Sequence, residues 1–337
     1  MMLMSAAGDV VHALPLVSAI KRYRPACTIS WILQPLPATM VRGHPCVDQI
    51  IEFDRSLGAR AFTDVRSRLR AQEFDLLIDL QVYFKAGIVT ALTDATVKLG
   101  FDHARARDLN WLFTNRKIPP RPIRHVQDQY LEFLEYLEIP YAPLEWNIGP
   151  WAAERAWQSQ WIEGFDRPVA AVVLATSKPE KDWVPERWAS VCDALYSDYG
   201  LQPVLVGGRS DRELHAERVI RELVSCPIRS ELGSGLRKLI GILDASALVL
   251  APDTGPLHMA VAMNRPAISL LGYTNPKRTG PYRRFHDLMI DAYANPGEDY
   301  VPTMENRRGR MIRITVEDVL QRVQIWRDRY AHSLSRT

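Results

Sequence analysis

The sequence predicts an α/β protein of two domains, each built from helices packed around a parallel β-sheet. Three observations predict this fold class. Short apolar runs alternate with helical periodicity along almost the whole chain, as in parallel sheets. The length of 337 residues suits two domains of about 150 residues each. Residues 138–168, rich in proline and tryptophan, lose the periodicity and are the expected connection between the domains.

The first half of the chain alternates short apolar segments with helical ones. Its best-defined helix is predicted over residues 125–137, because Val126, Tyr130, Phe133 and Leu137 fall on one helical face. The expected strands are residues 2–4, 28–33, 49–53, 76–80 and 97–100, and the expected helices are residues 15–24, 63–71 and 125–137.

The second half repeats this alternation. A terminal helix is expected over residues 315–332, where Val319, Val323 and Trp326 lie on one side. The expected strands are residues 169–174, 203–206, 247–250 and 267–270, and the other expected helices are residues 186–196, 211–223 and 236–245.

These elements define the expected domain organisation. We expect Rossmann-like domains at residues 1–150 and 151–314, and a C-terminal helix within residues 315–337 that packs back on the N-terminal domain. The two domains are expected to face each other across a cleft, because ligands of open α/β sheets bind outside the carboxyl ends of the strands.

Composition excludes several classes of function. The net charge of +3 does not call for a nucleic-acid partner. The four cysteines have no metal-binding spacing and are expected to be reduced, so no metal site is predicted. No apolar stretch approaches the roughly 18 residues of a membrane span, and the opening MMLM is too short for a signal peptide. We expect a cytoplasmic protein that contacts the inner membrane peripherally at most.

Charge is nevertheless uneven along the chain. Residues 55–124 hold 13 lysines and arginines against 7 acids. A solvated face explains such an excess, and so does a site for an anionic substrate or a membrane surface. Arg66 and Arg70 lie four residues apart on one helix face, which favours the solvated face for that pair.

The most informative segment is residues 249–272. An apolar strand ends at Asp253, Thr254 and Gly255, and a short helix with His258 in its first turn follows. Free N–H groups and partial positive charge at such a helix start suit a phosphate or diphosphate. The segment therefore predicts a phosphorylated ligand beside an acidic group.

Two further clusters follow predicted strands. Asp9 lies in a small-residue loop, where a helix N-cap is the alternative to a chemical role. Thr176, Ser177 and Lys181 combine hydroxyls with a cation, which can bind phosphate oxygens and stabilise a leaving group. Neither GxGxxG nor GxxxxGK[ST] is present, which disfavours a dehydrogenase and a P-loop kinase.

The clusters together resemble motifs of glycosyltransferase family 9, the heptosyltransferases of the lipopolysaccharide inner core. The resemblance runs over nearly the full chain. The matching segments are residues 8–15 (GDVVHALP, against GDVxHxLP), 75–85 (DLLIDLQVYFK), 112–117 (LFTNRK, against FYNRK), 176–183 (against TTxxxKxW) and 253–258 (DTGPLH, against DTGxxH). Val82 replaces a usual glycine, and residues 272–274, GYT, replace the usual GPT.

The resemblance implies a GT-B-like fold and an inverting, metal-independent transfer of heptose from ADP-heptose to the Kdo/lipid A inner core, with no cofactor. Asp9 is then the general base, and Lys181 with the helix start at Thr254 and Gly255 stabilises the diphosphate. The residues implied for the donor are Thr176, Ser177, Lys181, Glu213, Asp253, Thr254, Gly255 and His258. The residues implied for the anionic acceptor are Lys85, Arg116, Lys117 and Arg60.

Two alternatives remain open from the sequence. Val82 and Tyr273 alter two family positions, which leaves room for another nucleotide-sugar donor. A nucleotide-binding protein without catalysis is possible on the same fold, because fold alone does not determine function. Asp9, Lys181 and Asp253 together favour the enzyme.

Overall fold

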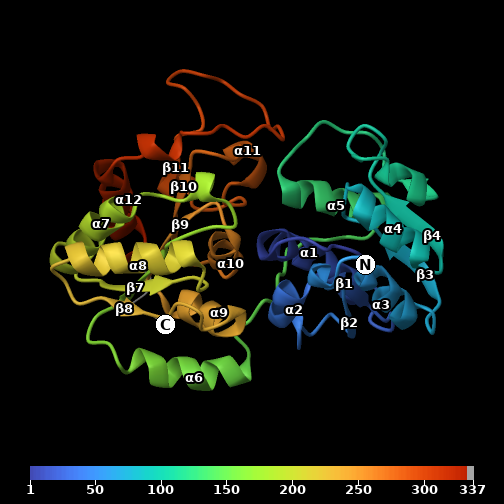
Figure 1. Ribbon diagram of the computed structural model, residues 1–337, viewed down its shortest axis with the longest axis horizontal. Helices are drawn as coiled ribbons and strands as arrows, with labels where there is room; N and C mark the ends of the chain where they lie inside the picture. The colour runs from blue at the N-terminus through green and yellow to red at the C-terminus, as the bar shows by residue number, and fades with distance from the viewer. Residues whose placement is uncertain (332–337) are drawn as a thin grey trace. The chain divides into compact units, whose positions relative to one another are not determined.

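The computed structural model describes residues 1–331 and divides the chain into two compact units. The N-terminal unit is Met1–Ile148 and the C-terminal unit begins at Gly149. The boundary lies within the stretch predicted to connect two domains. Figure 1 labels the elements of each unit.

The N-terminal unit is built from short strands, each followed by a helix. Its elements are α1 (Ala7–Tyr23), β1 (Ser30–Leu33), α2 (Pro35–Val41), β2 (Gln49–Glu52), η1 (Arg55–Leu57), α3 (Arg60–Leu69), β3 (Phe74–Ile78), α4 (Phe84–Leu92), β4 (Ala95–Gly100), η2 (Asn110–Phe113), β5 (Arg116–Lys117) and α5 (Val126–Tyr136).

The N-terminal unit contains two small sheets, and residues 2–4, predicted as the first strand, lie between them. β1 pairs with β2, and β3, β4 and β5 form a second sheet, all in parallel. Met2 forms parallel bridges to Ile32 in β1 and to Asp79 directly after β3. The carboxyl ends of all these segments therefore point to one edge, where ligands of α/β proteins bind.

Helix α1 begins at Ala7, well before the predicted start at residue 15. Pro15 lies inside the helix, where it removes one backbone hydrogen bond. Buried contacts compensate: α1 packs on α5, and His12 Nδ1 lies 3.2 Å from Gln127 Oε1. The packing of α1 in its unit thus keeps the helix continuous through Pro15.

The C-terminal unit contains longer helices and a wider sheet. Its elements are α6 (Ala152–Ile162), β6 (Val169–Val173), η3 (Pro179–Lys181), α7 (Pro185–Ser197), β7 (Gln202–Val206), α8 (Asp211–Leu223), β8 (Arg229–Ser230), α9 (Leu236–Ala245), β9 (Leu248–Pro252), α10 (Gly255–Ala262), β10 (Ala267–Leu271), α11 (Pro276–Thr279), η4 (His286–Leu288), β11 (Met289–Asp291), η5 (Met311–Arg313) and α12 (Val316–Arg329).

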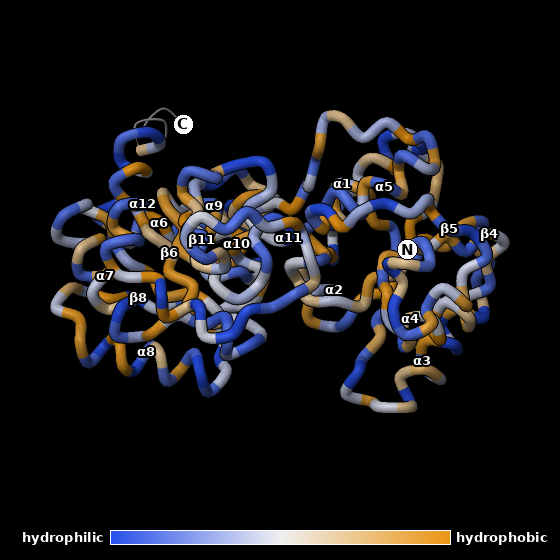
Figure 2. The backbone as a smooth tube through the Cα atoms, turned by 90° about the horizontal axis from the view of Figure 1, so that it is seen from above, coloured by the Kyte–Doolittle hydropathy of each residue, from blue (hydrophilic) through white to orange (hydrophobic). Residues whose placement is uncertain are grey.

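Six parallel strands form the sheet of this unit, in the order β11–β10–β9–β6–β7–β8. The strands β6, β9 and β10 are buried along their whole length, which explains their continuous apolar sequences. Figure 2 shows hydrophobic backbone around β6 and α10 and alternating hydropathy along the surface helix α8. Together with the N-terminal sheet, this confirms the predicted α/β class with parallel sheets.

One element of the C-terminal unit differs from the prediction. Helix α6 forms within the stretch expected to be irregular, and its start is held by Glu154, which accepts a hydrogen bond from the Trp151 N–H at 2.7 Å. Helix α12 packs on α7 and β11 of its own unit, and the Trp326 indole donates to the Ala247 carbonyl at 3.0 Å. Packing of the terminal helix on the N-terminal domain stays a prediction.

The predicted end of the terminal helix, residue 332, lies outside the described residues. Among residues 1–331, no helix is both long enough and apolar enough to cross a membrane. Within the same range, no group of histidine, cysteine, aspartate and glutamate side chains is arranged to hold a metal ion.

Candidate functional site

The centre of the candidate site in the C-terminal unit is Asp253, the residue that follows β9. Its Oδ2 atom accepts a hydrogen bond from the Lys181 ammonium at 2.7 Å and lies 3.3 Å from the Thr279 hydroxyl. Its Oδ1 atom lies 3.3 Å from His258 Nε2. Lys181 comes from η3 and His258 from α10, so three segments converge on one carboxylate.

The electrostatics of this cluster keep Asp253 ionised. Burial alone would raise the pKa of the carboxyl, but the charge of Lys181 and the His258 ring hold that pKa far below its ordinary value. The lysine also donates to the Asp253 carbonyl at 3.3 Å. Asp253 therefore fixes the position of a cation at the edge of the sheet.

Helix α10 begins directly beside this pair. Its N-cap is Thr254, whose side chain makes no capping hydrogen bond, and Gly255 is its first residue. The first N–H groups of a helix have no partner within the helix and carry partial positive charge. The site thus combines a helix start with the Lys181 ammonium, two features that attract phosphate oxygens.

Thr176 lies in an ordered loop after β6. Its N–H donates to Asp182 Oδ1 at 2.7 Å, and its carbonyl accepts from Arg212 Nη2 at 2.9 Å. Arg212 also forms an ion pair with Asp182. Ser177, the next residue, is exposed. The loop therefore holds the backbone of Thr176 and leaves the neighbouring hydroxyl of Ser177 at the surface.

Glu213, one of the residues implied for the donor, accepts hydrogen bonds from the loop that precedes α8. Its carboxylate accepts from the Gly208 N–H at 2.6 Å and from the Ser210 N–H at 2.9 Å. At Gly207, where φ is 153°, a Cβ would lie 2.6 Å from Glu213 Oε1. Glu213 thus shapes the loop between β7 and α8, and glycine is required where that loop approaches it.

In the N-terminal unit, Asp9 is the third residue of α1 and not its N-cap, which is Ala6. The carboxylate therefore does not cap the helix. Within residues 1–331, the hydrogen bond recorded for it comes from the Ser5 hydroxyl, which donates to Oδ2. Asp9 is partly exposed at the carboxyl end of the central strand segment, where a ligand of an α/β sheet would lie.

Two side chains near this loop were not anticipated from the sequence. The Arg55 guanidinium and the Gln34 amide both donate to the Met4 carbonyl, at 2.6 and 2.7 Å. Each follows the carboxyl end of a strand, and this position is the signal that could have identified them. They support the backbone immediately before Ser5.

The predicted acceptor residues lie on separate segments. Arg60 begins α3, Lys85 is in the first turn of α4, and both are exposed. Arg116 in β5 is exposed, whereas the Lys117 ammonium donates to the Thr114 carbonyl at 3.1 Å.

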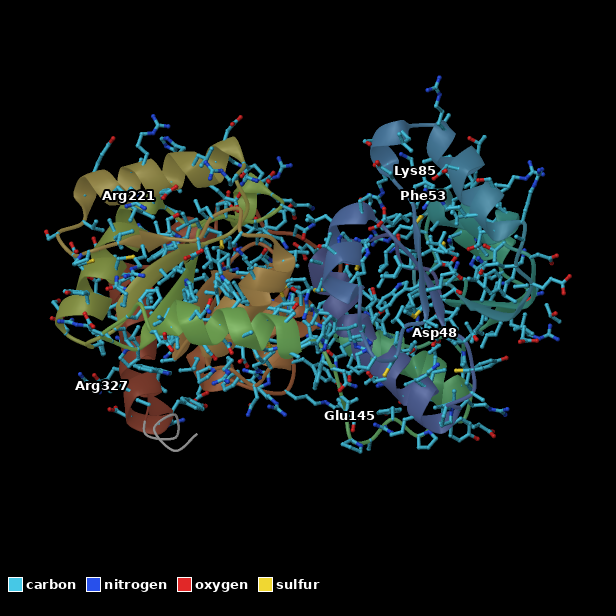
Figure 3. All side chains as sticks on the ribbon, turned by 90° about the horizontal axis from the view of Figure 1, so that it is seen from below. Asp48, Phe53, Lys85, Glu145, Arg221 and Arg327 are labelled. Carbon is cyan, nitrogen blue, oxygen red and sulfur yellow. The ribbon has the colours of Figure 1, made fainter. Side chains whose placement is uncertain are left out.

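Figure 3 shows where Lys85 lies in its unit. Lys85 lies at the same end of the unit as Phe53, the residue after β2. It lies away from Asp48, the residue before β2. Lys85 is therefore at the carboxyl edge of the N-terminal sheet.

One departure from the family motifs has a structural counterpart. Tyr273 is buried, and the Lys178 ammonium lies 5.5 Å from the centre of its ring. Thr274 is buried and bridges to Asn306 in the long loop after β11. The segment after β10 therefore packs an aromatic ring beside the loop that carries Lys181.

Comparisons with known proteins agree on one family. Residues 62–299 match the model of glycosyltransferase family 9 (heptosyltransferase). The chain is similar to the lipopolysaccharide core heptosyltransferase OpsX of Haemophilus influenzae, with 29% identity over 94% of this chain and 93% of the relative. It is 26% identical to lipopolysaccharide heptosyltransferase 1 of Escherichia coli K12, over 82% of this chain and 88% of the relative.

Solved structures show the same fold. The family 9 glycosyltransferase of Veillonella parvula superposes with a TM-score of 0.81 at 20% identity, covering 96% of this chain and 95% of the other. The E. coli heptosyltransferase WaaC with ADP superposes with a TM-score of 0.73 at 24% identity, covering 98% of each chain.

Proposed function

The chain belongs to glycosyltransferase family 9, the heptosyltransferases, and we propose that it transfers a heptose from ADP-heptose to the anionic Kdo/lipid A inner core of lipopolysaccharide. The chain is a glycosyltransferase, and the names of its relatives assign those proteins to lipopolysaccharide core synthesis. The observation that carries the donor half of the proposal is the Lys181–Asp253 pair at the start of α10.

The diphosphate of the donor would bind at this pair. Lys181 has three N–H donors, and Asp253 accepts from it through one carboxylate oxygen and its carbonyl. A further donor can reach a phosphate oxygen, together with the N–H groups of Thr254 and Gly255. The negative charge that develops on the leaving diphosphate would be stabilised by the ammonium and the helix start, without a metal ion or cofactor.

Asp253 and its neighbours would orient the sugar and the nucleotide. A carboxylate accepts several hydrogen bonds, so Asp253 can hold Lys181 and still accept from sugar hydroxyls. His258 beside it, and Ser177 in the loop after β6, offer further hydrogen-bonding groups toward the donor. Glu213 would reach the ribose from the first turn of α8.

The acceptor would be activated in the N-terminal unit. Asp9 takes the proton of the acceptor hydroxyl as that oxygen attacks the anomeric carbon and ADP leaves, which inverts the configuration at that carbon. The Ser5 hydroxyl donates a hydrogen bond to Oδ2 of Asp9, so Oδ1 would accept the proton of the acceptor hydroxyl. Arg60, Lys85, Arg116 and Lys117 would bind the carboxylates and phosphates of the acceptor.

Binding of ADP tests the donor half. Lys181→Met should weaken ADP binding about tenfold or more, because a charge-assisted hydrogen bond contributes about 1.5–3 kcal/mol. Lys178→Met is the matched control, since Lys178 is an exposed lysine of the same loop and its side chain does not contact Asp253. Isothermal titration measures both, and equal affinity of the two variants would contradict the assignment.

The altered segment around Tyr273 favours one second candidate, a family 9 transferase with a different donor sugar. Competition assays with ADP-, UDP- and GDP-linked sugars distinguish the two. Turnover with ADP-heptose above the others supports the proposal, whereas faster turnover with another nucleotide sugar supports the second candidate.

A further inference from the structure

The N-terminal unit exposes large apolar side chains at one edge of its sheet. Within the described residues, eight large apolar side chains of this unit are exposed, and six of them follow the carboxyl ends of strands. Those six are Leu36, Leu57, Tyr83, Phe84, Leu109 and Leu112. Exposed apolar residues that gather in one region mark an interaction surface, whereas scattered ones need no explanation.

Four of the six, here named the apolar rim, lie on two segments that contact each other: Tyr83, Phe84, Leu109 and Leu112. The segments that carry them are joined by hydrogen bonds. The Arg107 N–H donates to the Val82 carbonyl at 2.7 Å, and the Asn110 amide donates to the Tyr83 carbonyl at 3.2 Å.

Packing also joins the two segments of the rim. The ring of Phe84 packs on that of Phe113 with centroids 5.6 Å apart. Helix α4 and η2 therefore present the rim as one unit.

The backbone holds part of the rim in a strained conformation. Asp108 and Leu109 have φ values of 49° and 61°, in the left-handed region that leucine rarely adopts. The next residue, Asn110, is buried and donates to Asp79 Oδ2 at 3.2 Å. This anchor keeps the segment in place while Leu109 and Leu112, on either side of it, remain exposed.

Cations are exposed on the segments that carry the rim. Lys85, Arg107 and Arg116 are exposed on the same two segments or directly after them, and no ion pair is recorded for them in the part of the chain that is described. Asp108 is the exposed acid between them. Aromatic and aliphatic side chains flanked by lysine and arginine suit the interface of an anionic bilayer, where apolar groups insert and cations meet the headgroups.

We propose that the apolar rim seats the N-terminal unit on an anionic lipid bilayer. The inference rests on the proposed function, because a lipid-linked acceptor is presented at such a surface. The rim lies at the carboxyl edge of the sheet, the same edge at which the Ser5–Asp9 loop lies. Seating the rim on the bilayer brings that edge to the headgroup level, where the sugar of a glycolipid is found.

Vesicle binding tests the proposal. The full-length protein should co-sediment with vesicles of phosphatidylcholine and phosphatidylglycerol, and much less with phosphatidylcholine alone. Replacing both rim leucines, L109E with L112E, should lower the bound fraction about tenfold, because each change removes an apolar contact and adds a repelled charge. L223E is the matched control, since Leu223 at the end of α8 is 53% exposed and Leu112 is 56% exposed.

Three outcomes would overturn the proposal. The first is the absence of binding to anionic vesicles, and the second is equal binding of the double variant and the wild type. The third is self-association of the wild type that the double variant loses, which would assign the rim to a contact between copies of the chain. A thermal melt close to that of wild type shows that the double variant is folded. If it is not, Leu112→Gln replaces it in the same assay.

Transfer to a de-acylated, water-soluble acceptor separates this proposal from the proposed function. Leu109→Glu alone, at a position outside the segments that match the family motifs, should transfer heptose to that acceptor at the wild-type rate. Failure of the wild type to use any inner-core acceptor would refute the proposed function and leave vesicle binding as a separate result. Normal transfer without vesicle binding would refute only the role of the rim.

Discussion

At the scale of single residues, the proposed role of Asp9 as a base depends on its contact with Ser5. Asp9 lies in the first turn of α1 but does not cap it, and the Ser5 hydroxyl bonds one of its oxygens. That bond orients the carboxylate. The sequence predicted Asp9 as a candidate, but the role of Ser5 depends on a backbone bend that has no sequence signal.

Ser5→Ala tests this positioning role. A hydrogen bond to a charged group contributes about 1.5 kcal/mol, so kcat should fall roughly tenfold. Ser5→Thr keeps the hydroxyl and should restore kcat, and both variants should bind ADP as the wild type does. A kcat that Ser5→Thr does not restore would assign Ser5 a purely structural role.

At the scale of elements, local signals predicted some helices well and others poorly. The bounds of α8 and α9 are those predicted, and α8 carries the capping pair Ser210 and Glu213 that marks a helix start in a sequence. Helix α6 was missed because it lies in a stretch that resembles a linker and packs on the distant helix α9, where the Gln158 amide donates to the Gly241 carbonyl at 2.7 Å. A cap can be recognised in the local sequence, whereas a contact between distant segments cannot.

Asp79 connects three elements of the N-terminal unit. This buried carboxyl at the end of β3 accepts from the Gln81 N–H, from the Thr90 hydroxyl of α4 and from Asn110 of η2. Burial raises its pKa to about 6, even though these hydrogen bonds lower it. Because the folded-state pKa lies above the unfolded value, the folded protein binds the proton more tightly, and stability should fall as pH rises from about 4 to about 6.

Asp79→Asn should remove this pH dependence. The pKa of Asp79 differs by roughly two units between the folded and the unfolded state. The free energy of unfolding of the wild type should therefore fall by about 3 kcal/mol between pH 4 and pH 6. Chemical denaturation at several pH values measures it, with Asp108→Asn, an exposed neighbour, as the control. A variant whose stability follows the same pH curve as the wild type would show that Asp79 is not the titrating group.

At the scale of the whole molecule, the sequence predicted two α/β units and the segments of the donor site, but not how those segments meet. Lys181 and Asp253 are 72 residues apart, and each was placed after its own strand. Their contact arises because β6 pairs with β9, which makes the loops after these strands neighbours. Strand order is a property of the assembled sheet, so Thr279 and the lysine–aspartate pair could not be predicted from local patterns.

Heptosyl transfer with Asp9 as the base is the central proposal for this protein. The most direct measurement is a transfer assay with ADP-heptose and a de-acylated Kdo-containing acceptor. Its readouts are the release of ADP and the mass of the acceptor. The wild type should add one heptose with inverted configuration, and Asp9→Asn should lower turnover by roughly 10²–10⁴-fold while ADP binding is retained. Turnover of Asp9→Asn close to that of the wild type would contradict the account.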